Sequence, residues 1–159
     1  MKRERISEDM YQTKKDFCEE NFRRFFNRNY CLHIQTCTKK SGDVLTLRFQ
    51  IAPILNGKVV FTGTSIFQLS SKELTQLCRF LLLRTATQLE FPFHNGKTLK
   101  LEANPETGLN VQIIEKGKVA SFMVPNDELF SVTGIALSTL ARREMLDSIT
   151  TMTMIKNGL

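Results

Sequence analysis

The residues best suited to chemistry in this sequence are lysines that each follow a glycine at the start of a predicted β-strand. Lys58, Lys97 and Lys118 stand at such positions. Glycine allows a tight turn in which the backbone can approach a ligand closely, and the adjacent ammonium group can neutralise a phosphate. This spacing therefore predicts contacts with the phosphate backbone of a nucleic acid.

Further basic and aromatic residues stand close to the same strand ends. Phenylalanine rings matter here because nucleobases stack on them, at about 1–3 kcal/mol per base. A single strand suits such a surface better than a duplex, since its bases are free to splay outward. The complete set of candidate nucleic-acid-binding residues is Lys39, Lys40, Arg48, Lys58, Phe61, Phe91, Phe93, Lys97, Lys100, Lys116 and Lys118.

A plainer interpretation of the same residues stays open. Glycine is a common turn residue wherever the backbone needs a positive φ. Phenylalanines are more often buried in a core than exposed. Any single lysine fits either interpretation, whereas the set as a whole favours a binding surface.

Motifs for catalysis are missing from the sequence. It contains no Gly-x-Ser-x-Gly, no glycine-rich phosphate loop and no His-Glu-x-x-His. His33 alternates with apolar residues and His94 stands in a predicted turn, so both are interpreted as structural or surface histidines. The four cysteines form no Cys-x-x-Cys pair, which argues against a zinc site. We therefore predict a protein that is not an enzyme and uses no cofactor and no metal.

Composition sets the class of protein. A chain of 159 residues with 42% hydrophobic and 24% charged residues is typical of a single globular domain. Its net charge of +6 is compatible with a nucleic-acid partner. No apolar run is long enough to span a membrane. The first residues show neither a signal nor a transit peptide, so we expect an intracellular protein of the cytoplasm or nucleoid, or of the host cytoplasm if the chain is viral.

Apolar periodicity predicts an α+β chain with antiparallel sheets. Leu45, Leu47 and Phe49 alternate with polar residues, which is typical of a strand with one face in the core. Pro53 is expected to end that strand. Predicted helices cover residues 8–27, 72–83 and a segment that follows Pro125. Predicted strands cover residues 30–38, 44–51, 58–69 (as one strand or two), 88–93, 97–103, 109–114 and 118–124.

The two ends of the chain differ from its middle. The predicted helix 8–27 either packs its phenylalanines on the body while its charges are solvated, or forms a basic arm that reaches nucleic acid or a neighbouring subunit. Residues 147–159 are β-branched and show no cap, so we expect them to fray or to dock on a neighbouring chain. The predicted organisation is a helical basic arm over 1–28, a sheet-and-helix tandem domain over 29–145 and a tail over 146–159.

The tandem domain shows two strand-to-helix junctions of similar construction. Phe67-x-Leu69-Ser70-x-x-Glu73-Leu74 aligns without a gap with Phe122-x-Val124-Pro125-x-x-Glu128-Leu129. A Glu-Phe…Phe-His segment over 90–94 and a Lys-Leu-x-x-x-Pro…Gly turn over 100–108 stand between the two junctions. Two such units predict one domain built from related halves.

The order and spacing of these segments over about residues 44–140 resemble the Whirly proteins and, more distantly, the single-unit coactivator positive cofactor four. The nearest match to the Lys-Gly-Lys-Ala-Ala-Leu signature of plant Whirly proteins is Lys116–Ala120, which stands in the second half of the chain.

The resemblance implies two four-stranded antiparallel sheets, each followed by a helix, and assembly as dimers or tetramers. It also implies binding of single-stranded DNA with little sequence preference, in replication, recombination or transcription. Two alternatives stay open: a protein of the same fold that binds or anneals RNA, as the related kinetoplastid proteins do, and an oligomeric protein-interaction module without nucleic acid.

Overall fold

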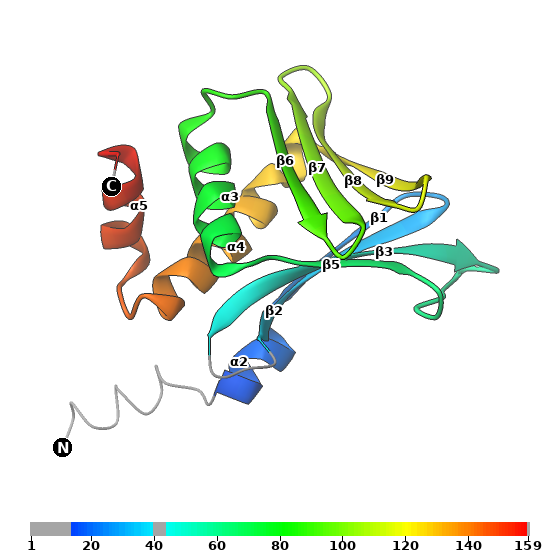
Figure 1. Cartoon of the computed structure of the whole chain (residues 1–159), viewed down its shortest axis with the longest axis horizontal. Coiled ribbons are helices and arrows are strands. Elements are labelled where there is room, and N and C mark those ends of the chain that lie inside the picture. The colour runs from blue at the N-terminus through cyan, green and yellow to red at the C-terminus, as the bar shows by residue number, and fades with distance from the viewer. Residues whose placement is uncertain (1–13, 40–43, 159) are drawn as a thin grey trace.

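The computed structural model describes residues 14–39 and 44–158, in which strands form two antiparallel sheets flanked by helices (Figure 1). Sheet 1 contains β1 (Phe22–Phe26), β2 (Tyr30–Thr38), β3 (Leu45–Leu55), β4 (Lys58–Val59) and β5 (Ser65–Gln68). Sheet 2 contains β6 (Gln88–His94), β7 (Lys97–Asn104), β8 (Gly108–Glu115) and β9 (Lys118–Pro125). The helices are α2 (Lys14–Glu20), α3 (Ser71–Leu83), α4 (Leu129–Arg143), which follows the short 3-10 helix η1 (Asn126–Glu128), and α5 (Ser148–Lys156).

Sheet 1 separates its side chains between two faces. Its order is β1-β2-β3-β4, and β5 also pairs with β3. Ile34, Phe49 and Phe67 stand opposite one another on the inner face, where all three are buried. The next residues along the strands, His33 and Gln50, pair on the outer face, because successive side chains alternate across a strand.

Sheet 2 is a meander of four strands in the order β6-β7-β8-β9. Asn95-Gly96 and Lys116-Gly117 form two of its turns, and all four residues have positive φ. Two-residue hairpins need this conformation, which glycine and asparagine adopt readily. The apolar alternation of these strands therefore closes into a sheet with Leu99, Leu101 and Val111 on its buried face.

Each sheet leads into a helix, as predicted. Ser70 caps α3: its Oγ accepts a hydrogen bond from the Glu73 backbone N–H at 3.3 Å, and the Glu73 carboxylate accepts one from the Ser70 backbone N–H at 2.8 Å. This capping box satisfies two N–H groups that would otherwise lack partners. Sheet 2 leads through η1 into α4, whose Arg143 Nη1 donates to the Ser71 carbonyl at 2.6 Å and so joins the two helices.

A single core lies between the inner faces of the sheets and helices α3 and α4. Its largest fully buried side chains include Phe49, Phe67 and Phe122. Thr36 of β2 and Thr139 of α4 share a buried hydrogen bond of 2.7 Å between their hydroxyls. The predicted α+β class, with two antiparallel sheets each followed by a helix, is confirmed. In the described part of the chain, no helix is long and apolar enough to cross a membrane.

Three local predictions are wrong. The helix predicted over 8–27 ends at Glu20 within the described residues, and Phe22–Phe26 form strand β1, which pairs with β2. Strand β3 continues through Pro53 to Leu55; the proline stands near the end of the strand, where a missing donor costs little. The tail contains helix α5, which Asp147 caps by accepting from the Thr150 N–H at 2.6 Å. As a division into domains, the boundaries at residues 28 and 145 stay a prediction.

Candidate nucleic-acid interface

Strand β1 brings aromatic and basic side chains to the outer face of sheet 1. It pairs antiparallel with β2, so that Phe22 stands opposite Gln35 and Arg24 opposite His33. Phe25 points to the core with 3% of its surface exposed, whereas Phe22 on the outer face is 37% exposed. The strand therefore buries Phe25 in the core and presents the Phe22 ring and the Arg24 guanidinium on the outer face of sheet 1.

Four of these outer side chains form what we call the aromatic–arginine cluster: Phe22, Arg24, His33 and Phe61. The rings of Phe22 and His33 lie 5.5 Å apart between centroids, and those of His33 and Phe61 lie 6.2 Å apart. The Arg24 guanidinium carbon lies 5.0 Å from the Phe22 centroid and 5.7 Å from that of Phe61. Residues from β1, β2 and the loop between β4 and β5 thus meet at one place.

Hydrogen bonds fix the protonation of His33 in this cluster. Arg24 Nε donates to His33 Nδ1 at 3.0 Å, so the ring proton sits on Nε2, which lies 3.3 Å from Gln35 Oε1. Burial lowers the pKa of His33, the charges of Arg24 and Arg48 lower it further, and the hydrogen bond to Gln35 acts in the opposite direction. His33 is therefore neutral at neutral pH, and Arg24 supplies the positive charge of the cluster.

This arrangement can bind the two chemical parts of a nucleic-acid strand. Phe22 and Phe61 are 37% and 42% exposed, which leaves ring surface on which a base can stack. A guanidinium held over aromatic rings is well suited to a phosphate, because its planar fork of donors matches the phosphate oxygens. Rings and cation stand within the reach of one nucleotide.

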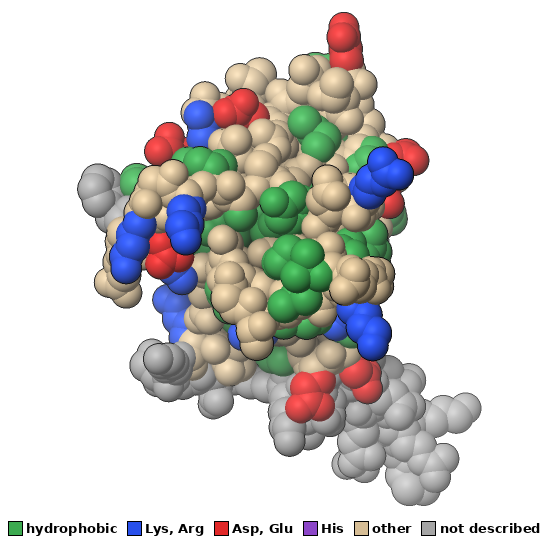
Figure 2. All heavy atoms as spheres, turned by 90° about the vertical axis from the view of Figure 1, so that its right-hand side faces the viewer, with side chains coloured by type: hydrophobic (Ala, Val, Ile, Leu, Met, Phe, Trp, Pro, Cys, Tyr) green, Lys and Arg blue, Asp and Glu red, His purple; other side chains and the backbone are tan. Residues whose placement is uncertain are grey.

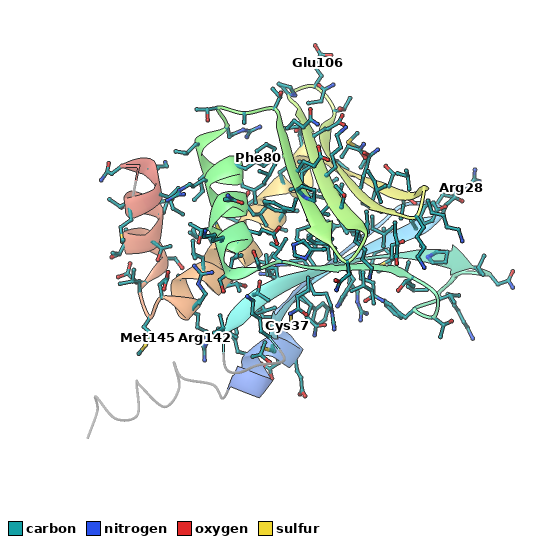
Figure 3. All side chains as sticks on the ribbon, in the orientation of Figure 1. Arg28, Cys37, Phe80, Glu106, Arg142 and Met145 are labelled. Carbon is teal, nitrogen blue, oxygen red and sulfur yellow. The ribbon has the colours of Figure 1, made fainter. Side chains whose placement is uncertain are left out.

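Three hairpin tips add positive charge at one end of the molecule. The β1–β2, β3–β4 and β8–β9 turns lie at the right-hand end of Figure 1, where Arg28 is labelled in Figure 3. These turns carry Arg28, Lys58, Lys116 and Lys118, all exposed. Within residues 14–39 and 44–158, none of these four side chains forms an ion pair. Seen end-on, apolar side chains occupy the centre and lysines and arginines lie on either side (Figure 2).

Some of the residues predicted to bind nucleic acid lie on this surface, and others have partners within the protein. Phe61 belongs to the cluster, and Lys58, Lys116 and Lys118 lie at the tips. Arg48 lies half-buried on the same outer face, where its Nη2 donates to Gln35 Oε1 at 2.9 Å. The backbone N–H of Lys39 donates to the Val44 carbonyl. Lys40 lies outside the described residues.

The remaining predicted residues are on or beneath sheet 2. Phe91 is a core residue with 3% exposure, so its ring is not open to a base. Lys97 Nζ donates to the Ile66 carbonyl of sheet 1 at 3.0 Å, and Lys100 Nζ lies 3.0 Å from Glu102 Oε1. The backbone of Phe93 lies in β6, and a role for its side chain stays a prediction. The two lysines therefore have protein partners that a phosphate would have to replace.

The candidate residues predicted from sequence do not include Phe22, Arg24 or His33, although the alternative of a basic arm that reaches nucleic acid contains Arg24. Phe22, Phe25 and Phe26 recur at helical spacing, so the sequence predicts a helix there, and the pairing with β2 that makes the segment a strand is not visible in the local pattern. The sequence predicts a structural or surface histidine at position 33; His33 is buried, with 6% of its surface exposed, and it belongs to the cluster.

The Cys37 thiol is partly buried and the Cys78 thiol is buried, and His94 contacts a glutamate of the protein. Burial raises the pKa of Cys37 to about 11 and that of Cys78 to about 12, so both thiols are protonated and poorly nucleophilic at neutral pH. His94 Nε2 lies 2.7 Å from Glu73 Oε1 and joins β6 to the start of α3. Within the described residues, no group of three or more His, Cys, Asp or Glu side chains is arranged to hold a metal ion.

Two antiparallel sheets, each followed by a helix, define a Whirly-like fold. The structure is similar to the Whirly proteins WHY3 and WHY1 of Arabidopsis thaliana. The WHY3 structure matches with a TM-score of 0.56 and 16% identity over 85% of this chain and 94% of that one. The WHY1 structure matches with a TM-score of 0.52 and 17% identity over 76% of this chain and 88% of that one. No protein-family model and no curated protein sequence matches the chain. The resemblance in fold is therefore confirmed.

Proposed function

We propose that this protein is a sequence-nonspecific single-stranded DNA-binding protein that acts in DNA replication, recombination or transcription and catalyses no reaction. The observation that carries the proposal is the aromatic–arginine cluster, which offers exposed rings beside a guanidinium on the outer face of sheet 1. Bases stack on Phe22 and Phe61, while phosphates contact Arg24 and the basic hairpin tips. The Whirly-like fold supports the same function.

Assembly as a dimer or tetramer is part of the proposal. Met145 and Ile149 are 84% and 73% exposed at the end of α4 and on α5. Large apolar side chains this open to water are common where a second protein surface packs. We place this interface on the helices, away from the outer face of sheet 1, so that assembly leaves the cluster accessible.

The salt dependence of binding tests the electrostatic part of the proposal. Affinity for a single-stranded oligonucleotide is expected to fall with rising salt, with a log–log slope of about −0.7 for each phosphate neutralised. If Arg24 and the four tip cations each contact one phosphate, the slope is roughly −3 to −4. Fluorescence anisotropy titrations over a range of salt concentrations measure it. An affinity independent of salt, or no binding at all, would contradict the proposal.

A pair of matched charge reversals locates the phosphate contacts. Lys58→Glu combined with Lys118→Glu is expected to weaken binding. It should also make the slope of log affinity against log salt shallower by the contribution of about two phosphates. The control combines Lys72→Glu with Arg84→Glu, which changes the net charge equally at exposed positions at the two ends of α3. If both double variants lost the same affinity for the oligonucleotide, the effect would come from net charge, and the hairpin tips would not contact the DNA.

Competition between DNA and RNA oligonucleotides of one sequence separates the DNA ligand from the RNA alternative, because the 2′-hydroxyl is the main difference between them. A protein-interaction module would bind neither, and the charge reversals at Lys58 and Lys118 would leave its partner binding intact.

A further inference from the structure

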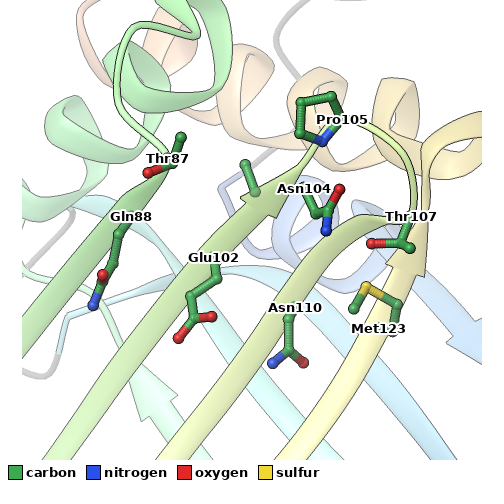
Figure 4. A pocket seen from close by; sticks show the side chains of 9 residues that line it. Thr87, Gln88, Glu102, Asn104, Pro105, Thr107, Asn110 and Met123 are labelled. Atoms are coloured by element: carbon green, nitrogen blue, oxygen red, sulfur yellow. The ribbon is translucent and has the colours of Figure 1, made fainter.

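The outer face of sheet 2 contains a hollow of about 480 Å³ that the binding surface on sheet 1 does not use (Figure 4). Its floor is one row of side chains in register across all four strands: Gln88 opposite Glu102, Glu102 opposite Asn110, and Asn110 opposite Met123. Pro105 and Thr107 of the β7–β8 turn form one wall. The hollow is therefore built by strand register, with side chains from β6, β7, β8 and β9.

The polar side chains on this floor keep hydrogen-bond donors and acceptors that are available to a ligand. Glu102 Oε1 lies 3.0 Å from Lys100 Nζ, so Oε1 keeps one of its two lone pairs as an acceptor and Oε2 keeps both. Asn110 Oδ1 accepts from Ser121 Oγ at 2.9 Å, so its amide Nδ2 is left as a donor. Within the described residues the Gln88 amide forms no hydrogen bond, and it can act as donor or acceptor.

Met123 gives the floor its apolar part. It is 42% exposed at the end of the register row, and a thioether packs favourably against aromatic rings. A planar ring can therefore rest on Met123 while its edge reaches Asn110 and Glu102. Concave sites that combine apolar surface with a few convergent polar groups are typical of small-ligand binding.

The charge of the hollow selects a base over a phosphate. Among the described residues that line the hollow there is no lysine or arginine. Lys100, two residues before Glu102 on β7, is already paired with it, and a carboxylate repels phosphate oxygens. Glu102 instead accepts hydrogen bonds from N–H groups. An unpaired nucleobase fits these groups, because its ring is planar and its Watson–Crick edge presents hydrogen-bond donors.

Guanine matches this set of groups better than the other bases. It presents two adjacent donors, N1–H and the N2 amine, to one carboxylate, in the parallel geometry that also makes arginine–carboxylate pairs strong. Its O6 acceptor then faces an amide donor such as Asn110 Nδ2. Thymine presents a single N–H between two carbonyls that the carboxylate repels, and adenine and cytosine each present one amine beside an acceptor.

We propose that this hollow is a guanine subsite, in which Glu102 accepts from N1–H and N2–H while the ring rests on Met123. The inference rests on the proposed single-strand binding, and it adds a preference for isolated guanines to binding that otherwise depends little on sequence. A strand that crosses from sheet 1 to sheet 2 would place its bases on both outer faces.

Three single strands of equal length test the proposal: thymine only, thymine with isolated guanines, and the same strand with inosine in place of guanine. The full chain is expected to bind the guanine strand roughly 5- to 150-fold more tightly than the thymine strand, the range for one good bidentate base contact. Inosine keeps N1–H and lacks the amine, so most of the preference should disappear with it. This comparison changes only the ligand and needs no variant.

Glu102→Gln should abolish the guanine preference and leave the affinity for thymine unchanged or slightly higher. Glu106→Gln is the matched control, because it removes the same charge from an exposed residue that does not line the hollow. Equal affinity for the guanine and thymine strands, or a preference that Glu102→Gln leaves intact, would overturn the subsite while single-strand binding stands. Failure to bind any of the three strands would overturn the proposed function itself.

Discussion

Replacing Phe22 and Phe61 together by alanine is expected to weaken binding to single-stranded DNA by about 30-fold to about 10⁴-fold, because each ring that stacks on a base contributes roughly 1–3 kcal/mol. Both rings flank Arg24, whose guanidinium lies 5.0 and 5.7 Å from their centroids. Their loss therefore removes the stacking surface and also the support that holds the guanidinium. Fluorescence anisotropy with a thymine-only oligonucleotide measures the change.

The salt slope distinguishes this explanation from general damage to the surface. Phenylalanine neutralises no phosphate, so the double variant should bind more weakly with a nearly unchanged slope. Phe130→Ala is the control, since this ring is 88% exposed on α4, outside both sheets. A double variant that binds like the wild type, or a control that weakens binding equally, would show that the cluster does not hold bases.

Gly108→Ala is expected to destabilise the fold by about 3–5 kcal/mol, which is above the usual range for a single substitution. Gly108 begins β8 with φ +136°, and a Cβ built there would lie 2.0 Å from the Val124 carbonyl oxygen of β9. Because Gly108 pairs with Pro125 across the strands, the clash can be relieved only by separating β8 from β9. Urea unfolding followed by circular dichroism measures the loss.

Gly96→Ala provides the matched control for Gly108→Ala. Gly96 also has a positive φ of +81°, and nothing lies within 4 Å of a Cβ built there. Its cost should be about 1 kcal/mol, the usual penalty for a residue with a Cβ in the left-handed region. If both alanine variants lose the same stability, then the close approach of β8 and β9 is not what requires glycine at position 108.

The strands and helices of the two halves could be predicted because their signals are local. Alternation in residues 45–51 and 97–103, turns such as Asn95-Gly96, and the Ser70–Glu73 capping box each act over a few residues. Strand β1 could not be predicted in the same way. Its residues are compatible with a helix when taken alone, and pairing with β2 decides in favour of a strand. Tertiary context overrode the local preference.

The candidate site could be predicted only in part for a related reason. Residue type identified Phe61 and Lys58 as able to bind, and both are exposed. Residue type does not say which phenylalanine is buried, and Phe91 lies in the core. Nor does it reveal partners distant in sequence, such as the Ile66 carbonyl that Lys97 contacts. The cluster itself depends on three segments that meet only after folding.

Ultraviolet cross-linking of the full chain to a thymine-only single strand, followed by mass spectrometry of the cross-linked peptides, tests most directly whether sheet 1 holds the strand. The proposed function predicts cross-links in peptides that contain Phe22 or Phe61, and their loss in the double variant of Phe22 and Phe61. Cross-links confined to the helices or to sheet 2, with none on β1 or on the loop that carries Phe61, would contradict it.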